Sequence, residues 1–106
     1  MITLEEFKKA EMKVGKIISA EKIEGSEKLL KLMVDFGSEQ RQILSGIAKF
    51  YEATFLVGRE ALFITNLEPR SMMGLESHGM LLAADSESGP VLLCPEKEVP
   101  AGSIIK

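Results

Sequence analysis

The sequence contains little of what most metalloproteins and membrane proteins rely on. Its 106 residues include one cysteine (Cys94), one histidine (His78) and no tryptophan. A single cysteine excludes an internal disulfide, and one cysteine with one histidine cannot supply a set of zinc ligands. No apolar run approaches the ~18 residues of a membrane span, and the acidic start of the chain does not resemble a secretion signal. We therefore expect a cytoplasmic protein with no metal, no other cofactor and no membrane partner.

Candidate catalytic residues are equally scarce. Ser77 and His78 are the only neighbours that resemble a nucleophile and its base. Consecutive residues entering a strand point to opposite faces, so the imidazole does not readily reach the hydroxyl beside it. We expect no catalytic residues and no enzymatic activity, and a small hydrolase is the least favoured alternative.

Positive charge is distributed unevenly along a chain whose net charge is −3. Residues 8–49 carry nine cations against six acids, whereas residues 50–106 carry four cations against eight acids. A local basic surface can bind an anionic ligand even on an acidic protein. Only six residues are aromatic, so platforms that stack single-stranded bases are expected to be few. This combination favours recognition of the backbone and shape of a folded RNA.

Local signals predict a helix at the start of the chain, over Met1–Glu11. Thr3 is a good N-cap, and Glu6 stands three residues later to complete a capping box. Ile2 and Phe7 are spaced to form a hydrophobic staple around that cap.

Beyond the helix, the pattern changes to short apolar, β-branched runs separated by turn residues. Gly15 lies inside the first run and indicates a bulge or bend there. A short helical connector is expected over Gly46–Tyr51 and a polar loop over Asn66–Glu76. Strands are predicted over Met12–Ile23, Leu29–Phe36, Arg41–Ser45, Ala61–Thr65, Gly79–Ala84 and Val91–Leu93.

Three strands, a connector helix and two further strands follow the plan of the OB-fold, a five-stranded barrel that often binds oligonucleotides. A small SH3-like barrel is the nearest alternative. We predict an all-β protein with an OB-fold five-stranded barrel, a short N-terminal helix, a connector helix and extra C-terminal strands. The expected organisation is one domain over residues 1–106, with the helix at 1–11, the barrel at 12–94 and an extended tail at 95–106. Val99, Ile104 and Ile105 in this tail are expected to form contacts of a symmetric homodimer.

Six segments of the chain carry recognisable motifs: Val14–Ile17, Glu27–Leu29, Val34–Gly37, Ser45–Ile47, Asn66–Arg70 and Met73–Met80. Together they closely resemble the tRNA-binding domain family, and the segment from Asn66 to Met80 is the most specific. Members of that family occur as free-standing tRNA-binding proteins, as C-terminal modules or β subunits of methionyl-tRNA synthetase, and as a secretion-related chaperone. The extent from Met1 to Lys106 suggests the free-standing form.

The resemblance implies an OB barrel that holds the outer corner of tRNA with little regard for base sequence. It also implies a homodimer and the catalytic chain of methionyl-tRNA synthetase as a partner, in cis or in trans. On matching positions, Ser77 and Met80 are the first candidates for tRNA contact, through a hydroxyl to phosphate or ribose and an apolar cover beside it. Asn66, Lys28 and Arg70 follow, although Asn66 could instead bond the backbone of its own loop. The alternative function is that of an OB-fold protein-binding chaperone.

Overall fold

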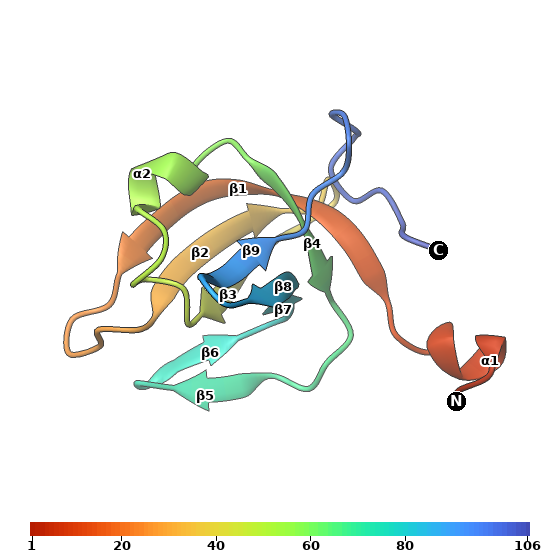
Figure 1. Ribbon diagram of the computed structural model, residues 1–106, viewed down its shortest axis with the longest axis horizontal. Helices are drawn as coiled ribbons and strands as arrows, with labels where there is room; N and C mark the ends of the chain where they lie inside the picture. The colour runs from red at the N-terminus through yellow and green to blue at the C-terminus, as the bar shows by residue number, and fades with distance from the viewer.

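The computed structural model describes residues 1–106 and confirms an all-β, OB-like barrel (Figure 1). Five antiparallel strands form the main sheet in the order β3-β2-β1-β4-β7, with β1 between β2 and β4. These strands are β1 (Met12–Lys22), β2 (Leu30–Asp35), β3 (Gln40–Ser45), β4 (Glu60–Ile64) and β7 (Met80–Leu81). Two hairpins and two short helices complete the fold: β5 (Arg70–Met72) with β6 (Leu75–Ser77), β8 (Ala83–Ser86) with β9 (Gly89–Leu92), α1 (Leu4–Phe7) and α2 (Ala53–Leu56).

The long first strand bends so that it serves both sides of the barrel. Lys16 is paired with Glu60 of β4 and with Asp35 of β2. The irregularity in register lies between Ile17 and Ser19, so the bulge predicted at Gly15 occurs slightly later in the strand. Gly15 instead marks a close approach. A Cβ atom at this position would lie 2.4 Å from Cγ1 of Val34.

Alternating burial along the strands produces the core. In β2, Leu30, Leu32 and Val34 are fully buried, while the residues between them are partly exposed. Phe36 and Phe63 meet edge to face, with ring centroids 5.5 Å apart and an interplanar angle of 84°, an arrangement that aromatic pairs prefer. The other core residues come from β1, β3, β4, β7 and the connector: Ile17, Ile43, Ile47, Leu56, Ala61 and Leu81.

The seam between β3 and the end of β6 is held by polar contacts rather than a continuous strand ladder. The amide of His78 donates to the carbonyl of Gln42 at 2.9 Å, and the amide of Leu44 donates to Oγ of Ser77 at 2.9 Å. The guanidinium of Arg41 donates to the carbonyls of Thr65 and His78. These contacts nearly close the barrel.

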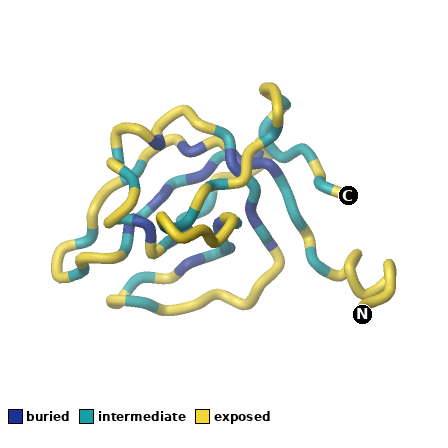
Figure 2. The backbone as a smooth tube through the Cα atoms, in the orientation of Figure 1, coloured by how far each residue is buried: buried dark blue, intermediate teal, exposed yellow.

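The C-terminal tail packs against the barrel, whereas the N-terminal helix does not. The tail runs beside the start of β1, where Val14 donates to Ser103 and Ile105 donates to Met12 (Figure 1). The tail is therefore extended where it packs beside β1. The N-terminal helix is shorter than predicted and covers Leu4–Phe7, although its capping box of Thr3 and Glu6 is present at 3.1 and 3.0 Å. The helix lies apart from the barrel and buries none of its residues (Figure 2).

Two further segments differ from the sequence prediction. The expected connector helix at Gly46–Tyr51 is a turn, and α2 follows it at Ala53–Leu56, with Leu56 as its buried anchor. The polar loop predicted over Asn66–Glu76 contains the β5–β6 hairpin, whose turn consists of Met73 and Gly74 at φ 53° and 75°. Neither helix has the length or the apolar character required to cross a membrane.

Candidate nucleic-acid interface

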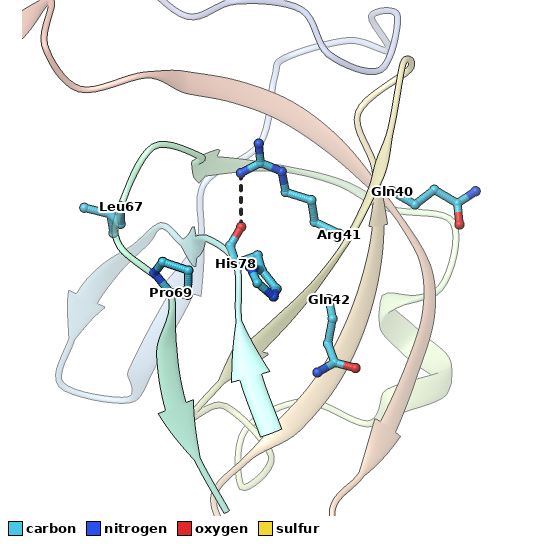
Figure 3. A pocket seen from close by; sticks show the side chains of 6 residues that line it. All are labelled: Gln40, Arg41, Gln42, Leu67, Pro69 and His78. Carbon is cyan, nitrogen blue, oxygen red and sulfur yellow. Dashed lines mark hydrogen bonds between the residues drawn. The ribbon is translucent and has the colours of Figure 1, made fainter. Parts of the chain in front are cut away.

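A polar cleft lies where the start of β3 faces the segment after β4. Its volume is about 370 Å³, and polar side chains form most of its wall (Figure 3). Three of them, Gln40, Arg41 and Gln42, are consecutive residues of β3. Leu67, Pro69 and His78 form the opposite side. In OB-folds this position, beside the strand 2–3 face and the loop between strands 4 and 5, is the one that binds oligonucleotides.

Arg41 is held rigidly in this cleft. Its Nη1 atom donates to the carbonyl of His78 at 3.3 Å and to the carbonyl of Thr65, and its Nε atom pairs with the carboxylate of Glu39. The bond to His78 is drawn in Figure 3. Because Glu39 neutralises part of its charge, Arg41 contributes shape and hydrogen-bond direction more than free positive charge.

The remaining polar groups of the cleft are mostly neutral. Nε2 of Gln42 donates to the carbonyl of Glu76 at 2.9 Å, and the imidazole of His78 lies 3.8 Å from the Glu76 carboxylate. The Gln40 side chain is exposed and takes part in no internal hydrogen bond. A cleft with amide donors and one partly neutralised guanidinium suits a polar backbone better than an apolar ligand.

Lys28 and Arg70 provide unneutralised charge. Both are exposed, and neither takes part in an ion pair. Lys28 lies in the β1–β2 loop. The carbonyl of Lys28 accepts a hydrogen bond from the amide of Ala48 at 2.9 Å, which ties this loop to the connector after β3. This loop reaches the tip of the β5–β6 hairpin, since a Cβ on Gly25 would lie 3.3 Å from Cε of Met73. The loop that carries Lys28 therefore adjoins the hairpin that begins at Arg70.

Asn66 is occupied by the N-terminal segment. Its amide oxygen accepts from the backbone N–H of Glu11, and its amide nitrogen donates to the carbonyl of Lys9, both at 2.7 Å. Next to it, Oγ1 of Thr65 donates to the carboxylate of Glu11 at 2.6 Å. That bond, aided by the charge of Lys13 and opposed by desolvation, lowers the pKa of Glu11. The Asn66 side chain thus bonds residues 9–11 rather than its own loop, and it holds these residues against the end of β4.

Ser77 lies inside the protein. Its side chain is fully buried, its oxygen accepts from the amide of Leu44, and its hydroxyl donates to the carbonyl of Gly79 at 3.0 Å. Backbone groups of the seam between β3 and β6 therefore use this hydroxyl both as an acceptor and as a donor. A side chain at position 79 would have no room, because its Cβ atom would lie 3.0 Å from the carbonyl oxygen of Ile64 and 3.1 Å from Cδ1 of Ile43. Met80 is half-buried in β7, opposite Ile64.

The predicted residues are therefore not all brought to one surface. Lys28 and Arg70 are available to a ligand, Met80 is partly available, and Ser77 and Asn66 make internal bonds. The cleft residues Gln40 and Gln42 were not among the predicted site residues, and Arg41 counted only as one of the nine cations of residues 8–49. The available signal was the run of three polar residues that opens a strand whose next two residues, Ile43 and Leu44, are buried.

Comparison with known proteins identifies the family. The model of a family described as "Putative tRNA binding domain" matches residues 12–104. The chain belongs to this family. The tRNA-binding domain is 52% identical over 106 residues to a methionine–tRNA ligase of Methanothrix thermoacetophila, and 47% identical over 102 residues to that of Archaeoglobus fulgidus. These matches cover 100% and 96% of the chain but only 16% of each ligase, so the chain spans about one sixth of these relatives.

Solved structures give the same assignment. A MetRS-related protein from Pyrococcus horikoshii superimposes with a TM-score of 0.94 and 42% identity, and the match covers 100% of this domain and 98% of that chain. The CsaA chaperone of Picrophilus torridus superimposes with a TM-score of 0.92 and 26% identity over the full length of both chains. The tRNA-binding domain therefore shares its fold both with a MetRS-related protein and with a protein described as a chaperone.

Proposed function

We propose that this protein is a non-catalytic tRNA-binding module that recognises the shape and backbone of tRNA. It would act in the cytoplasm and raise the tRNA affinity of methionyl-tRNA synthetase, either as part of the same chain or as a separate partner. The observation that carries this proposal is the family match over residues 12–104, together with the identity to methionine–tRNA ligases.

The site geometry supports backbone recognition. The cleft beside β3 offers side-chain amide donors, and Lys28 and Arg70 have no acidic partner. Such groups bond phosphate and sugar oxygens, which fixes a protein on a nucleic acid without reading its bases. Acidic side chains at Glu68 and Glu76 flank Arg70 in the sequence, so moderate affinity is expected.

Binding to bulk tRNA should weaken steeply as salt concentration rises. In filter binding or fluorescence anisotropy, the slope of log affinity against log salt should be roughly −0.7 to −0.9 for each phosphate neutralised. Lys28→Ala and Arg70→Ala should each weaken binding about fivefold, equivalent to ~1 kcal/mol, and reduce the steepness of the slope by roughly one phosphate contact. Unrelated tRNAs should bind with similar affinity.

A matched control for these substitutions is Lys97→Ala, which removes an exposed cation from the tail. It should leave both affinity and slope unchanged. A large preference for one tRNA, or equal effects of all three substitutions, would contradict backbone recognition at this surface.

A second candidate function follows from the similarity to the CsaA chaperones, at 26% identity and TM-scores of 0.90 and 0.92. In this alternative the domain binds unfolded or extended polypeptides. Titration with a labelled apolar peptide distinguishes the two: tight peptide binding without tRNA binding would favour the chaperone function.

We also propose that the protein is a symmetric homodimer, formed by the two ends of the chain. An apolar groove of about 560 Å³ lies between α1 and the tail, lined by Leu4, Phe7, Met12, Ile104 and Ile105 among others. Leu4 and Ile104 are 67% and 72% exposed. Because α1 buries nothing against its own barrel, a second copy that places its own ends in this groove would give each helix an apolar partner. An interface of this kind is self-complementary.

Charges introduced into this groove should therefore produce monomers. Leu4→Lys and Ile104→Lys are expected to shift the species seen by sedimentation at micromolar concentration from dimer to monomer, because each would bury an unpaired ammonium beside the lysines that also line the groove, Lys8, Lys9, Lys13 and Lys106. Val91→Lys changes an apolar residue of 49% exposure outside the groove and should leave the dimer intact. A parent protein that sediments as a monomer would exclude the dimer.

A further inference from the structure

Three of the six aromatic residues gather on the connector between β3 and β4. Phe50, Tyr51 and Phe55, with Glu52, line a shallow cavity of about 280 Å³. Phe50 and Phe55 are 54% and 49% exposed. The cavity shares no lining residue with the cleft beside β3. The small number of aromatic residues predicts few stacking platforms. Half of these six residues nevertheless form this one cluster.

The rings are held in place by the β8–β9 hairpin. Phe50 packs on Gly89, where a Cβ atom would lie 2.5 Å from the ring. The hydroxyl of Tyr51 donates to the carbonyl of Pro90 at 3.1 Å and accepts from the amide of Leu92 at 3.2 Å. Tyr51 and Phe55 lie with ring centroids 6.0 Å apart and tilted by 33°. A ligand would therefore meet rings that are already ordered, which lowers the entropy cost of binding.

Positive charge accompanies the rings. The guanidinium carbon of Arg59 lies 3.6 Å from the ring centroid of Phe55, and its Nε atom donates to the carbonyl of the same residue at 2.8 Å. Lys49 directly precedes Phe50 in the chain. Neither cation takes part in an ion pair, so both are available to a phosphate. Glu52, on the cavity wall, can accept a hydrogen bond from the N–H groups of a base.

We infer that this aromatic platform, defined by Phe50, Tyr51 and Phe55, binds an unpaired nucleobase of RNA. Every base has a π-face that stacks on an aromatic side chain, and a nearby cation can neutralise the phosphate that follows the base. Exposed rings with two unpaired cations match this chemistry, whereas an apolar peptide would gain nothing from the cations. The inference rests on the proposed RNA-binding function and adds to it a contact with an unpaired segment, separate from the cleft.

The test uses two probes with the same charge. One is a fluorescently labelled octamer of adenylate, and the other is an abasic phosphodiester chain of the same length. Phe55→Leu and Phe50→Leu keep an apolar side chain but remove the ring. Each should weaken binding of the octamer about tenfold, within the range measured for one stacked base, and leave the slope against salt unchanged. Binding of the abasic chain should be the same in all variants.

Val57→Ala serves as the control, because it trims a neighbouring apolar side chain of 49% exposure that carries no ring. Melting curves identify any variant that loses stability. Arg59→Lys provides a variant that leaves both rings in place, keeps the charge and removes the planar group over Phe55. Because charge is the only contribution assigned to Arg59, this variant should bind the octamer and the abasic chain as the parent does.

The outcomes separate this inference from the proposed function. If tRNA and the octamer bind to the parent and to folded ring variants equally, the platform is excluded while tRNA binding stands. If the parent binds the octamer through the rings but does not bind tRNA, the proposed function fails and the platform stands. Binding of an apolar peptide at the rings, with no octamer binding, would overturn the inference.

Discussion

Gly15→Ala is expected to destabilise the protein by about 3 kcal/mol, at the upper end of what one added methyl group costs in a packed core. Gly15 is buried in β1, where it pairs with Ala61 of β4. Its Cβ atom would lie 2.4 Å from Val34, 2.7 Å from Phe36 and 3.0 Å from Phe63. All three are themselves buried and packed on one another. None can move aside without displacing a second strand.

This loss should appear as a fall in the melting temperature of roughly 12–24 °C, since 1 kcal/mol corresponds to about 4–8 °C in a domain of this size. Gly46→Ala is the matched control, because a Cβ atom there has no neighbour within 4 Å and the residue does not adopt a positive φ. Its melting temperature should remain within about 2 °C of the parent, the range of a neutral surface substitution. Equal stability of the two variants would show that the core accommodates the methyl group added by Gly15→Ala.

The strands were predictable because they depend on local pattern. Alternating apolar residues such as Leu30, Leu32 and Val34 locate β2 and its buried face without any knowledge of its partners. The capping box was predictable for the same reason, since Thr3 and Glu6 lie within one turn of each other. The connector helix was misplaced because 4 residues of helix carry too little periodicity to separate Ala53–Leu56 from the preceding turn.

The candidate site was less predictable because its contacts join distant parts of the chain. Asn66 bonds to Lys9, which lies 57 residues away, and Ser77 bonds to Leu44, which lies 33 residues away. A polar side chain in a loop gives no sign of whether its partner is a ligand or another part of the protein. The cleft beside β3 arises in the same way, from strand order rather than from any segment. The family was nevertheless recognisable by resemblance, because its motifs, above all the segment from Asn66 to Met80, are continuous stretches of the sequence.

Ser77→Ala separates a structural role from a ligand-binding role at that seam. The substitution would leave the amide of Leu44 and the carbonyl of Gly79 without their present partner, in a site from which water is excluded. A buried polar group without a hydrogen bond costs about 1–3 kcal/mol, so the expected loss of stability is about 3 kcal/mol. Urea denaturation should therefore show a lower midpoint with an unchanged m-value. At temperatures where the variant remains folded, its affinity for tRNA should equal that of the parent.

The matched control is Ser71→Ala. Ser71 belongs to β5 of the adjoining hairpin, is exposed, and forms no side-chain hydrogen bond within the protein. Its replacement should change stability by less than about 0.5 kcal/mol, as is usual for a surface position. If Ser77→Ala instead keeps the parent's stability and loses tRNA binding, the hydroxyl contacts the ligand and the seam does not depend on it. Because the structure assigns both bonding directions of this hydroxyl to β3 and Gly79, we expect the opposite: a weakened barrel that still binds tRNA.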